Sequence, residues 1–455
     1  MLKEFSLSFY GCSCASVQTD KTRIICDPWF DTAAYEGTWV PDLDVSNWVR
    51  RIGDCNGIYI SHIHPDHYDP KSLFNYFKVY GEKKIFIPFF KNLKNVDRNW
   101  LKKKMVADGI NPNLIKQSKD GSFRLNDFNL HIIPSDTNSF SDIDSGIIIF
   151  NEKSKYSLTN LNDFGFSEKL MKKFQFQIKK KKLKNIATLY NYMSSGSWPH
   201  THYSCNDLNI SLKKSLEKQK KEFINRYKSV HEIIDSKIHL PFAAGAKYIG
   251  PLAKYEKFRP KTSVKRILNL DKKAVYLKPF AKKIDLIQID QNIKRINNFR
   301  PRIITENSTK NKKKFDFYDY EKKFKGLDYN ERILGKLFEA SKKRAFNRNE
   351  VKDKHILKIY ALPDWENFND LMLKNKITNK EKFLIGDIKF NLESADKIDK
   401  VHKTDIYLHY KALFGVLTGV VHWNNLELGS HKIVRRYPEV FNKEIVDFMN
   451  FFSLA

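Results

Sequence analysis

Short apolar runs bounded by polar turns follow one another through the first half of the chain. Apolar or alternating runs of about four to eight residues between turn residues are typical of β-strands. The pattern predicts strands at residues 5–11, 22–30, 57–61, 84–88, 128–133, 146–150, 156–161 and 237–242. We therefore expect the first half of the chain to be rich in β-structure.

Helical patterns lie between these strands and later replace them. The sequence predicts helices at residues 44–51, 70–77 and 93–106, and the second of these starts at a proline. From about residue 254 the chain becomes Lys-rich and mostly helical in pattern, and residues 295–314 are typical of a solvated, flexible connection. We expect two domains, residues 1–253 and 254–455, the second of them mostly helical.

The chain has 455 residues, of which 41% are hydrophobic and 29% are charged, and this composition excludes a wholly disordered protein. The net charge is +29, from 81 Lys and Arg against 52 Asp and Glu. Lys accompanies Asn and Ile along the whole chain, as it does where base composition drives codon use. A polyanionic partner such as nucleic acid is the alternative explanation of this charge.

The five cysteines are scattered and odd in number, so they predict no secreted disulfide framework. The N-terminal residues are too polar for a signal peptide. The apolar stretch at residues 412–421 is shorter than the ~20 residues that cross a bilayer. We expect a cytoplasmic protein without a membrane span.

The most informative stretch is the segment 61–69, where His62, His64, Asp66 and His67 stand within six positions. Burying three imidazoles and a carboxylate without partners would cost several kcal/mol, and a metal removes that cost. His62 and His64 are two residues apart on an extended segment, so both point to the same side and can bind one ion. Asp66 and His67 follow on the turn and can reach a second ion.

This HxHxDH pattern, directly after an apolar strand and before a helix, resembles the metallo-β-lactamase superfamily. The resemblance covers roughly residues 1–250, and residues 26–30 (CDPWF) are similar to its lactonase-like branch. It implies an α/β (α+β) protein with a four-layer αββα sandwich. It also implies two divalent metal ions, Zn or Fe with Mn as a further choice, at one edge of the two sheets.

A weaker similarity connects residues 142–145, 160–163, 423–426 and 435–438 with the part of CMP-N-acetylneuraminate hydroxylase that lies outside its Rieske domain. No Cys in this chain has a His two or three residues further on, so a Rieske cluster pattern is absent from the sequence. A hydroxylase of this kind would take its electrons from a separate redox partner.

The superfamily resemblance implies further metal ligands downstream. A bridging Asp at the end of a strand corresponds to Asp163. Upstream of it, where relatives place a His, this chain has Asp142 and Asp144, and we expect one of these two carboxylates as a ligand. A carboxylate at that position would favour iron or manganese. The last expected His, near residues 241–245, is missing.

His200 and His202 form an HxH pair on a loop that contains Gly and Pro, and we expect at least one of them to bind metal or substrate. Two further pairs can clamp a phosphate or carboxylate of a substrate, and they are Lys247 with Tyr248 and Arg435 with Arg436.

These features predict an enzyme, a metal-dependent hydrolase in which Asp66 holds a metal-bound hydroxide and His200 or His202 assists. The hydroxide would attack an ester, lactone, amide or phosphodiester of an anionic small molecule, for example a sugar or nucleotide-sugar. Three alternatives stay open. They are a di-iron oxygenase related to sialic acid hydroxylase, an RNA or DNA nuclease of the same fold, and a non-catalytic relative that has lost ligands.

Overall fold

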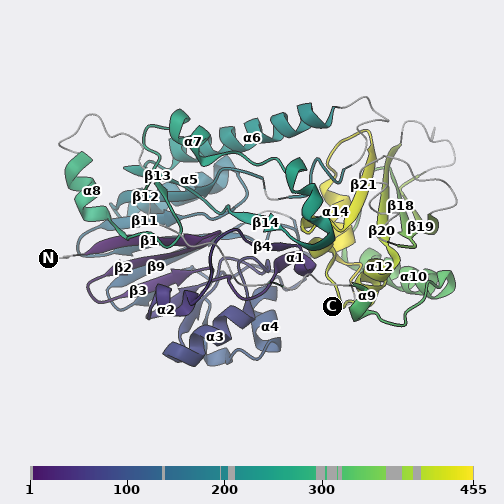
Figure 1. Ribbon diagram of the computed structural model, residues 1–455, viewed down its shortest axis with the longest axis horizontal. Helices are drawn as coiled ribbons and strands as arrows, with labels where there is room; N and C mark the ends of the chain where they lie inside the picture. The colour runs from purple at the N-terminus through teal and green to yellow at the C-terminus, as the bar shows by residue number, and fades with distance from the viewer. Residues whose placement is uncertain are drawn as a thin grey trace.

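The computed structural model describes residues 4–135, 139–194, 196–202, 211–293, 303–304, 315, 320–364, 382–392 and 401–453. Figure 1 shows two parts: purple to teal elements form a sandwich of two sheets, and green to yellow elements form a smaller sheet with its own helices.

Seven strands of the described chain form the first sheet, in the order β16-β1-β2-β3-β5-β6-β7. Their bounds are β1 (Phe5–Gly11), β2 (Cys14–Thr19), β3 (Arg23–Cys26), β5 (Gly57–Tyr59), β6 (Lys84–Phe86), β7 (Ile115–Lys116) and β16 (Ile284–Asp285). Strands β1 to β3 are antiparallel, whereas β3, β5, β6 and β7 run parallel. Parallel neighbours end at the same edge, so the residues that follow β3 and β5 meet there.

The second sheet has the order β13-β12-β11-β10-β9-β8 within the described residues. Its strands are β8 (Ser122–Leu125), β9 (Phe128–Pro134), β10 (Ser145–Asn151), β11 (Tyr156–Asn160), β12 (Lys184–Asn191) and β13 (Ile238–Phe242). Every strand that the sequence predicts has a counterpart in these two sheets, although β3 ends at Cys26 rather than near residue 30. The pattern does not predict β12, which is buried over nearly its whole length.

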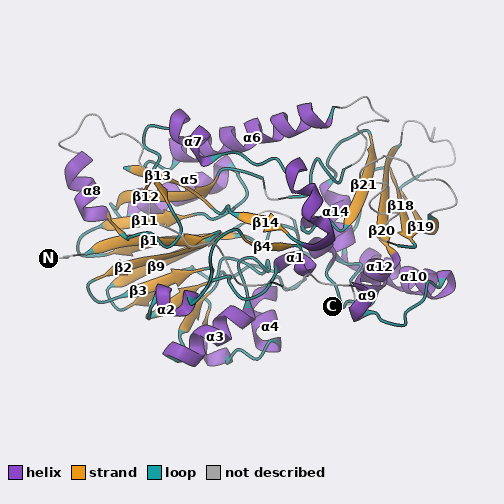
Figure 2. Ribbon diagram, in the orientation of Figure 1, coloured by secondary structure: helices purple, strands orange, loops and turns teal. Residues whose placement is uncertain are grey.

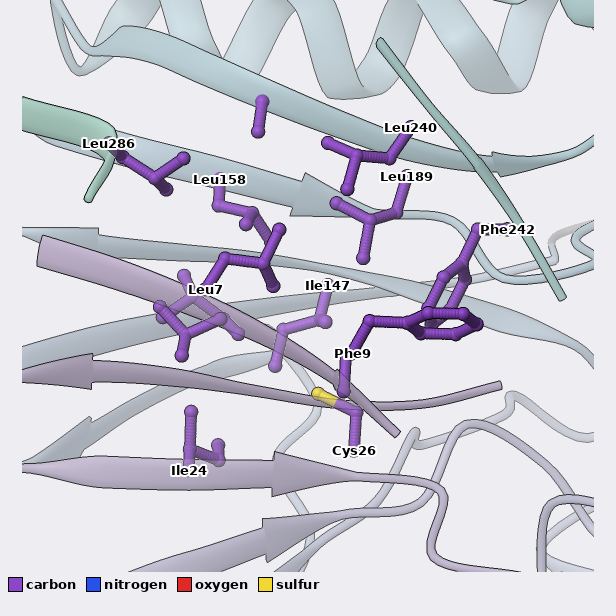
Figure 3. Close-up of a cluster of buried hydrophobic side chains, with 14 of the residues drawn as sticks. Leu7, Phe9, Ile24, Cys26, Ile147, Leu158, Leu189, Leu240, Phe242 and Leu286 are labelled. Carbon is purple, nitrogen blue, oxygen red and sulfur yellow. The ribbon is translucent and has the colours of Figure 1, made fainter. Parts of the chain in front are cut away.

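Apolar side chains from both sheets fill the space between them (Figure 3). Phe9 of β1 lies opposite Phe242 of β13, and the two rings are 5.4 Å apart between centroids. Burying one such side chain contributes about 1.5–3 kcal/mol. The contact between the sheets therefore stabilises the sandwich and fixes which strand ends share an edge.

Helices cover both outer faces of the sandwich (Figure 2). The first sheet is covered by α2 (Trp48–Ile52), α3 (Pro70–Tyr80) and α4 (Trp100–Ala107), and the second by α5 (Glu168–Lys180), α6 (Leu212–Ile233) and α7 (Val264–Leu270). Helix α3 begins as predicted, because Pro70 occupies its first turn and the Asp69 carboxylate accepts a hydrogen bond from the Lys71 amide at 3.1 Å. The predicted helix at 93–106 starts only at Trp100. The four-layer αββα sandwich is confirmed.

The sandwich extends beyond the predicted domain boundary at residue 253. That position lies inside the 3-10 helix η2 (Gly250–Phe258), and β16 later returns to pair with β1. Helix α8 (Leu286–Ile293) then contributes Leu286 to the core between the sheets. Residues on both sides of position 253 thus contribute to the sandwich. Two short sheets complete this part, one of β4 (Trp39–Pro41) with β14 (Ala246–Tyr248) and one of β15 (Tyr276–Leu277) with β17 (Ile303–Ile304).

The C-terminal part differs from the mostly helical region that the sequence predicts, because its core contains a sheet of order β19-β18-β20-β21. The strands are β18 (His355–Leu362), β19 (Phe383–Phe390), β20 (His402–His409) and β21 (Lys432–Tyr437). Helices α9 (Tyr320–Lys323), α10 (Glu331–Arg348), α12 (Tyr410–Leu417), α13 (Trp423–Leu428) and α14 (Lys443–Asn450) accompany it. Apolar residues of α10, α12 and α14 share one core with this sheet.

Most of the predicted flexible connection at residues 295–314 lies outside the described residues, which include only 303–304 of that range. Among the helices of the described chain, none combines the length and the apolar character that a membrane crossing needs.

Candidate metal centre

Three segments bring the candidate ligands to one edge of the sandwich. The loop 60–69 follows β5, Asp144 directly precedes β10, and Asp163 comes soon after β11. Because β10 and β11 are antiparallel neighbours, the start of the first and the end of the second lie at the same edge. The Tyr59 hydroxyl donates a hydrogen bond of 3.0 Å to the Ser145 carbonyl, which ties the two sheets together there.

The first group of candidate ligands consists of His62, His64 and Asp144, whose ligand atoms lie within 4.8 Å of one another. His62 Nε2 is 2.7 Å from His64 Nδ1 and 3.8 Å from Asp144 Oδ1. The His62 ring is buried, whereas 22% of the Asp144 side chain is exposed. Two imidazoles and one carboxylate form a donor set that binds zinc, iron or manganese.

The second group consists of His62, His67 and Asp163. His67 Nε2 lies 3.3 Å from Asp163 Oδ2 and 3.8 Å from Asp66 Oδ2. Two atoms that bind one tetrahedral ion at about 2 Å are themselves about 3.3 Å apart, so this spacing suits a shared ion. His62 belongs to both groups, and the groups therefore adjoin.

Asp27 and Ser61 fix the orientation of the His67 ring from behind. His67 Nδ1 is 3.0 Å from Asp27 Oδ2, and the Ser61 hydroxyl and amide donate to the same carboxylate at 2.7 and 2.8 Å. A carboxylate accepts from Nδ1–H, so Nε2, which faces Asp163, is the nitrogen that can supply a lone pair to a metal. Buried carboxylates behind a histidine are a common outer support of metal centres.

Tyr35 supports Asp66 in a similar way. Its hydroxyl donates a hydrogen bond of 2.5 Å to Asp66 Oδ1, which leaves Oδ2 facing His67. Burial, and then the negative charge of Asp66, raises the pKa of Tyr35 well above its usual range, so the phenol keeps its proton as a donor. Tyr35 lies in the short α1 (Ala34–Gly37) with φ at +51°, an uncommon conformation for a residue other than Gly.

Burial keeps two of the imidazoles neutral, as metal ligands must be. It lowers the pKa of His62 well below its ordinary value and lowers the pKa of His64 to about 4. Burial also opposes a charge on His67, but the carboxylates of Asp163 and Asp66 outweigh it and raise the pKa of His67 well above its ordinary range. Without metal, a proton therefore stays between His67 and Asp163.

Negative charge accumulates at this edge. Burial, Asp163 and Asp142 together raise the pKa of Asp144 well above its usual range. Asp163 Oδ1 is buried and has no hydrogen-bond partner among the described residues, and such an atom costs free energy unless something pairs with it. Orphaned carboxylate oxygen beside neutral imidazole nitrogen is the chemistry of a cation site. The residues present therefore fit divalent ions.

The C-terminal part contacts this cluster through α13. Asn424 Nδ2 lies 2.7 Å from His64 Nε2, and the neighbouring Asn425 donates a hydrogen bond of 3.0 Å to Glu36. His431 Nε2 lies 3.1 Å from the carbonyl oxygen of Tyr35. Segments almost 400 positions apart in the sequence thus meet at the residues that surround His64 and Asp66.

Some predicted ligands lie elsewhere. The Asp142 carboxylate is 2.8 Å from Lys443 Nζ and belongs to neither group, so only Asp144 of the two alternatives joins the cluster. His239, close to the position of the missing His, has its Nδ1 2.7 Å from Asp271 Oδ2. In the segment 241–245, where the resemblance implies a final His, Pro241, Phe242, Ala244 and Gly245 instead line a cavity.

The structure does not bring His200 and His202 into either group of candidate ligands. His200 Nε2 lies 3.0 Å from the Ser430 hydroxyl and 3.3 Å from the Tyr248 hydroxyl, in a buried polar group of its own. Burial lowers the pKa of His200 to about 3. His202 is also buried, and its backbone bridges to Val434 of β21. Both histidines therefore connect the sandwich with the C-terminal part.

In each of the two pairs that we expect to bind substrate, the two side chains have different surroundings. Lys247 is partly exposed, but its neighbour Tyr248 is buried and donates to or accepts from Ser430 at 2.7 Å. Arg436 is largely buried and lies 3.4 Å from Glu439, and Arg435 lies over the ring of Tyr407.

Sequence reasoning did not single out the residues that hold the ligands in place. Asp27 had a local signal, because it follows an apolar strand parallel to β5. Tyr35 had none. Asn424 lies inside residues 423–426, which the weaker similarity includes, but nothing in the sequence connects it with His64.

The arrangement of two facing sheets, outer helices and an HxHxDH loop at the end of β5 is the one that the sequence resemblance implies. The fold of the chain is thus an αββα sandwich, similar to that of the metallo-β-lactamase superfamily. Igni18, a metallo hydrolase of Ignicoccus hospitalis, is a similar solved structure, with 14% identity and a TM-score of 0.33 over 53% of this chain and 83% of that chain.

No family model matches the sequence. A Mycobacterium tuberculosis protein named as a Rieske 2Fe-2S iron-sulfur protein is 41% identical over 59 residues, 12% of this chain and 11% of the relative. The inactive cytidine monophosphate-N-acetylneuraminic acid hydroxylase of Homo sapiens is 31% identical over 65 residues, 14% of this chain and 13% of the relative. The match thus spans little more than a tenth of each of these relatives.

Proposed function

We propose that this protein is a metal-dependent hydrolase with two adjoining divalent ions. His62, His64 and Asp144 would bind one ion, and Asp66, His67 and Asp163 would bind the other. The observation that carries the proposal is the pair of groups of imidazole and carboxylate atoms, each within 4.8 Å, that share His62. The substrate would be an ester, lactone, amide or phosphodiester of an anionic small molecule.

When bound, a pair of divalent ions lowers the pKa of a coordinated water toward about 7 and polarises a carbonyl or phosphoryl oxygen. The side chains around the ions hold protons and orient the reacting groups. Tyr35 fixes one oxygen of Asp66, so the other oxygen faces His67, where it would help to hold the second ion and the attacking water. The Ser13 hydroxyl, 3.4 Å from His67 Nε2, adds a hydrogen-bond donor at the same edge.

Metal content and hydrolysis test this proposal together. The full chain, purified without a chelating tag, is expected to contain about two metal ions per molecule. Elemental mass spectrometry measures this metal content. It should hydrolyse at least one member of a panel of 4-nitrophenyl esters and bis(4-nitrophenyl) phosphate. Dialysis against EDTA should remove that activity, and zinc, manganese or iron should restore it. Metal-free protein, or hydrolysis that survives complete chelation, would refute the proposal.

A di-iron oxygenase is the second candidate, and one observation favours it. Each group contains two imidazoles and one carboxylate, the set that binds non-haem iron in oxygenases. The short match with the sialic acid hydroxylase supports this reading. Such an enzyme needs electrons from an external donor, because the sequence has no Rieske pattern.

Oxygen consumption separates the two candidates. Iron-loaded protein that has been prepared anaerobically should take up oxygen in the presence of a chemical reductant if it is an oxygenase, and zinc-loaded protein should not. A hydrolase shows no such uptake with either metal and hydrolyses the ester panel with zinc.

A further inference from the structure

A cavity of about 630 Å³ opens beside the candidate metal centre, and the proposed function leaves it without a role. Small-molecule sites in proteins have volumes of about 300–1,000 Å³. Its walls come from the end of β1, the segment 42–44 after β4, the turn 241–245 after β13 and the segment 276–280. The cavity is thus built by the same edge of the sandwich that carries the metal ligands.

One wall is shared with the metal centre. Cys12 lines the cavity, and the next residue, Ser13, places its hydroxyl 3.4 Å from His67 Nε2. Ala244 lines the cavity opposite and forms a β-bridge with Cys12. The adjacent residues Cys12 and Ser13 therefore connect the cavity with the second ligand group.

The charged side chains of the cavity leave one positive charge uncompensated. Lys247 Nζ pairs with Asp42 at 3.0 Å, and Arg51 lies 4.0 Å from the Asp44 carboxylate. The partly buried Lys278 has neither an ion pair nor a side-chain hydrogen bond with any residue that the structure describes. A ligand with a single negative charge would complete this balance.

The remaining wall is aromatic. Phe242, Tyr276 and Phe280 line the cavity, and the Arg51 guanidinium carbon lies 3.6 Å from the centroid of the Phe280 ring. Stacked aromatic and guanidinium surfaces favour a flat apolar group. Lys278 is two residues from both Tyr276 and Phe280, so charge and ring contact are available to one small molecule.

We propose that this cavity is the recognition site for the substrate, and that it selects an organic monoanion that carries an aromatic or other flat apolar group. Lys278 pairs with the anionic group, and Tyr276 and Phe280 contact the ring. The reactive bond then lies toward the wall of Cys12 and Ser13. The assignment to a substrate rests on the proposed function, whereas the class of ligand rests on the cavity alone.

Binding of naphthalene-2-acetate, compared with its neutral amide, tests the ligand class. Isothermal titration uses the full chain both metal-loaded and after EDTA dialysis, because a carboxylate can also bind a metal directly. In both forms we expect the acetate to bind at least about tenfold more tightly than the amide. Lys278→Ala should remove this preference, and Lys272→Ala, at an exposed lysine outside the cavity, should keep it.

Charge reversal gives a second variant. Lys278→Glu should bind 2-naphthylmethylamine more tightly than the acetate, which a merely destabilised protein would not do. Equal preference in Lys278→Ala and the unmodified chain, or a preference that disappears on chelation, would overturn the inference. If Lys278-dependent binding persists in a protein that contains no metal and hydrolyses nothing, the proposed function fails and the ligand class stands.

Discussion

Asn424 Nδ2 lies 2.7 Å from His64 Nε2, although 360 residues separate the two in the sequence. The contact joins α13 of the C-terminal part to a candidate ligand of the first group. An amide presents either its NH₂ or its oxygen to a neighbour after a half-turn. With the oxygen turned to Nε2–H, His64 keeps the lone pair of Nδ1 free, and Nδ1 is the atom that faces His62.

Removing this amide should weaken the metal centre without removing a ligand. We expect Asn424→Ala to lower metal affinity about 10- to 100-fold, the usual loss when the hydrogen-bond partner of a ligating histidine is deleted. Competition with a fluorescent chelator measures the effect. Asn425→Ala is the control, because Asn425 contacts Glu36 and no candidate ligand. Equal loss in both variants would show that docking of α13, rather than the Asn424 contact, is what matters.

The two neighbouring carboxylates before β10 should behave differently. Asp144→Asn removes an oxygen ligand of the first group, so we expect loss of one metal ion per chain and of nearly all activity. Asp142→Asn breaks only an ion pair with Lys443 on the surface and should change stability by about 0–1 kcal/mol, with metal content unchanged. Elemental analysis of the two variants measures their metal content and so tests this prediction. Loss of metal in the Asp142 variant would mean that the ligand assignment is reversed.

Asp27 should act through His67 rather than through a metal. Asp27→Asn preserves shape but replaces a carboxylate acceptor by an amide, so the ring of His67 loses its fixed orientation. We expect metal affinity at the second group to fall about 10- to 100-fold. Loading with one equivalent of cobalt and recording its visible spectrum would show which group remains occupied. An unchanged affinity would remove Asp27 from the support of the centre.

A buried histidine far from the centre should make stability depend on pH. His231 stacks on His239 at 3.9 Å between ring centroids, and its two nitrogens have no hydrogen-bond partner in the described chain. Burial, His239 and Lys273 lower the pKa of His231 well below 6.5. The unfolded chain therefore takes up a proton near pH 6.5 that the folded chain refuses, and stability falls as the pH drops below that value.

His231→Phe keeps an aromatic ring for the stack and removes the titration. Relative to this variant, the unmodified chain should lose up to about 1.4 kcal/mol per pH unit below pH 6.5, and the two should respond alike above pH 7. Urea unfolding from pH 8 to pH 5 measures the slopes. Parallel slopes over the whole range would show that His231 is not the group responsible.

The sequence alone predicts the parts of the fold that depend on local patterns. Apolar runs give the strands of the sandwich, and residues 61–69 give the ligands that one loop carries. The sequence does not predict which of Asp142 and Asp144 is the ligand, because the choice depends on the ion pair that Asp142 forms with Lys443, some 300 positions later.

The C-terminal sheet was missed for a related reason. In β19 buried and exposed positions alternate only partly, and one flank of the strand is an edge of the sheet. Short strands with one solvated face, set among Lys-rich segments, resemble surface helices in composition. The C-terminal sheet forms because strands far apart in the sequence pair with each other, as β18 does with β20. The local sequence does not predict such pairing.

The position of α13 near the end of the chain has a consequence for biosynthesis. A ribosome finishes the HxHxDH loop long before it reaches residue 424, so the emerging sandwich exposes a histidine whose amide neighbour does not yet exist. Ion uptake with final affinity then has to wait until residue 424 has been translated.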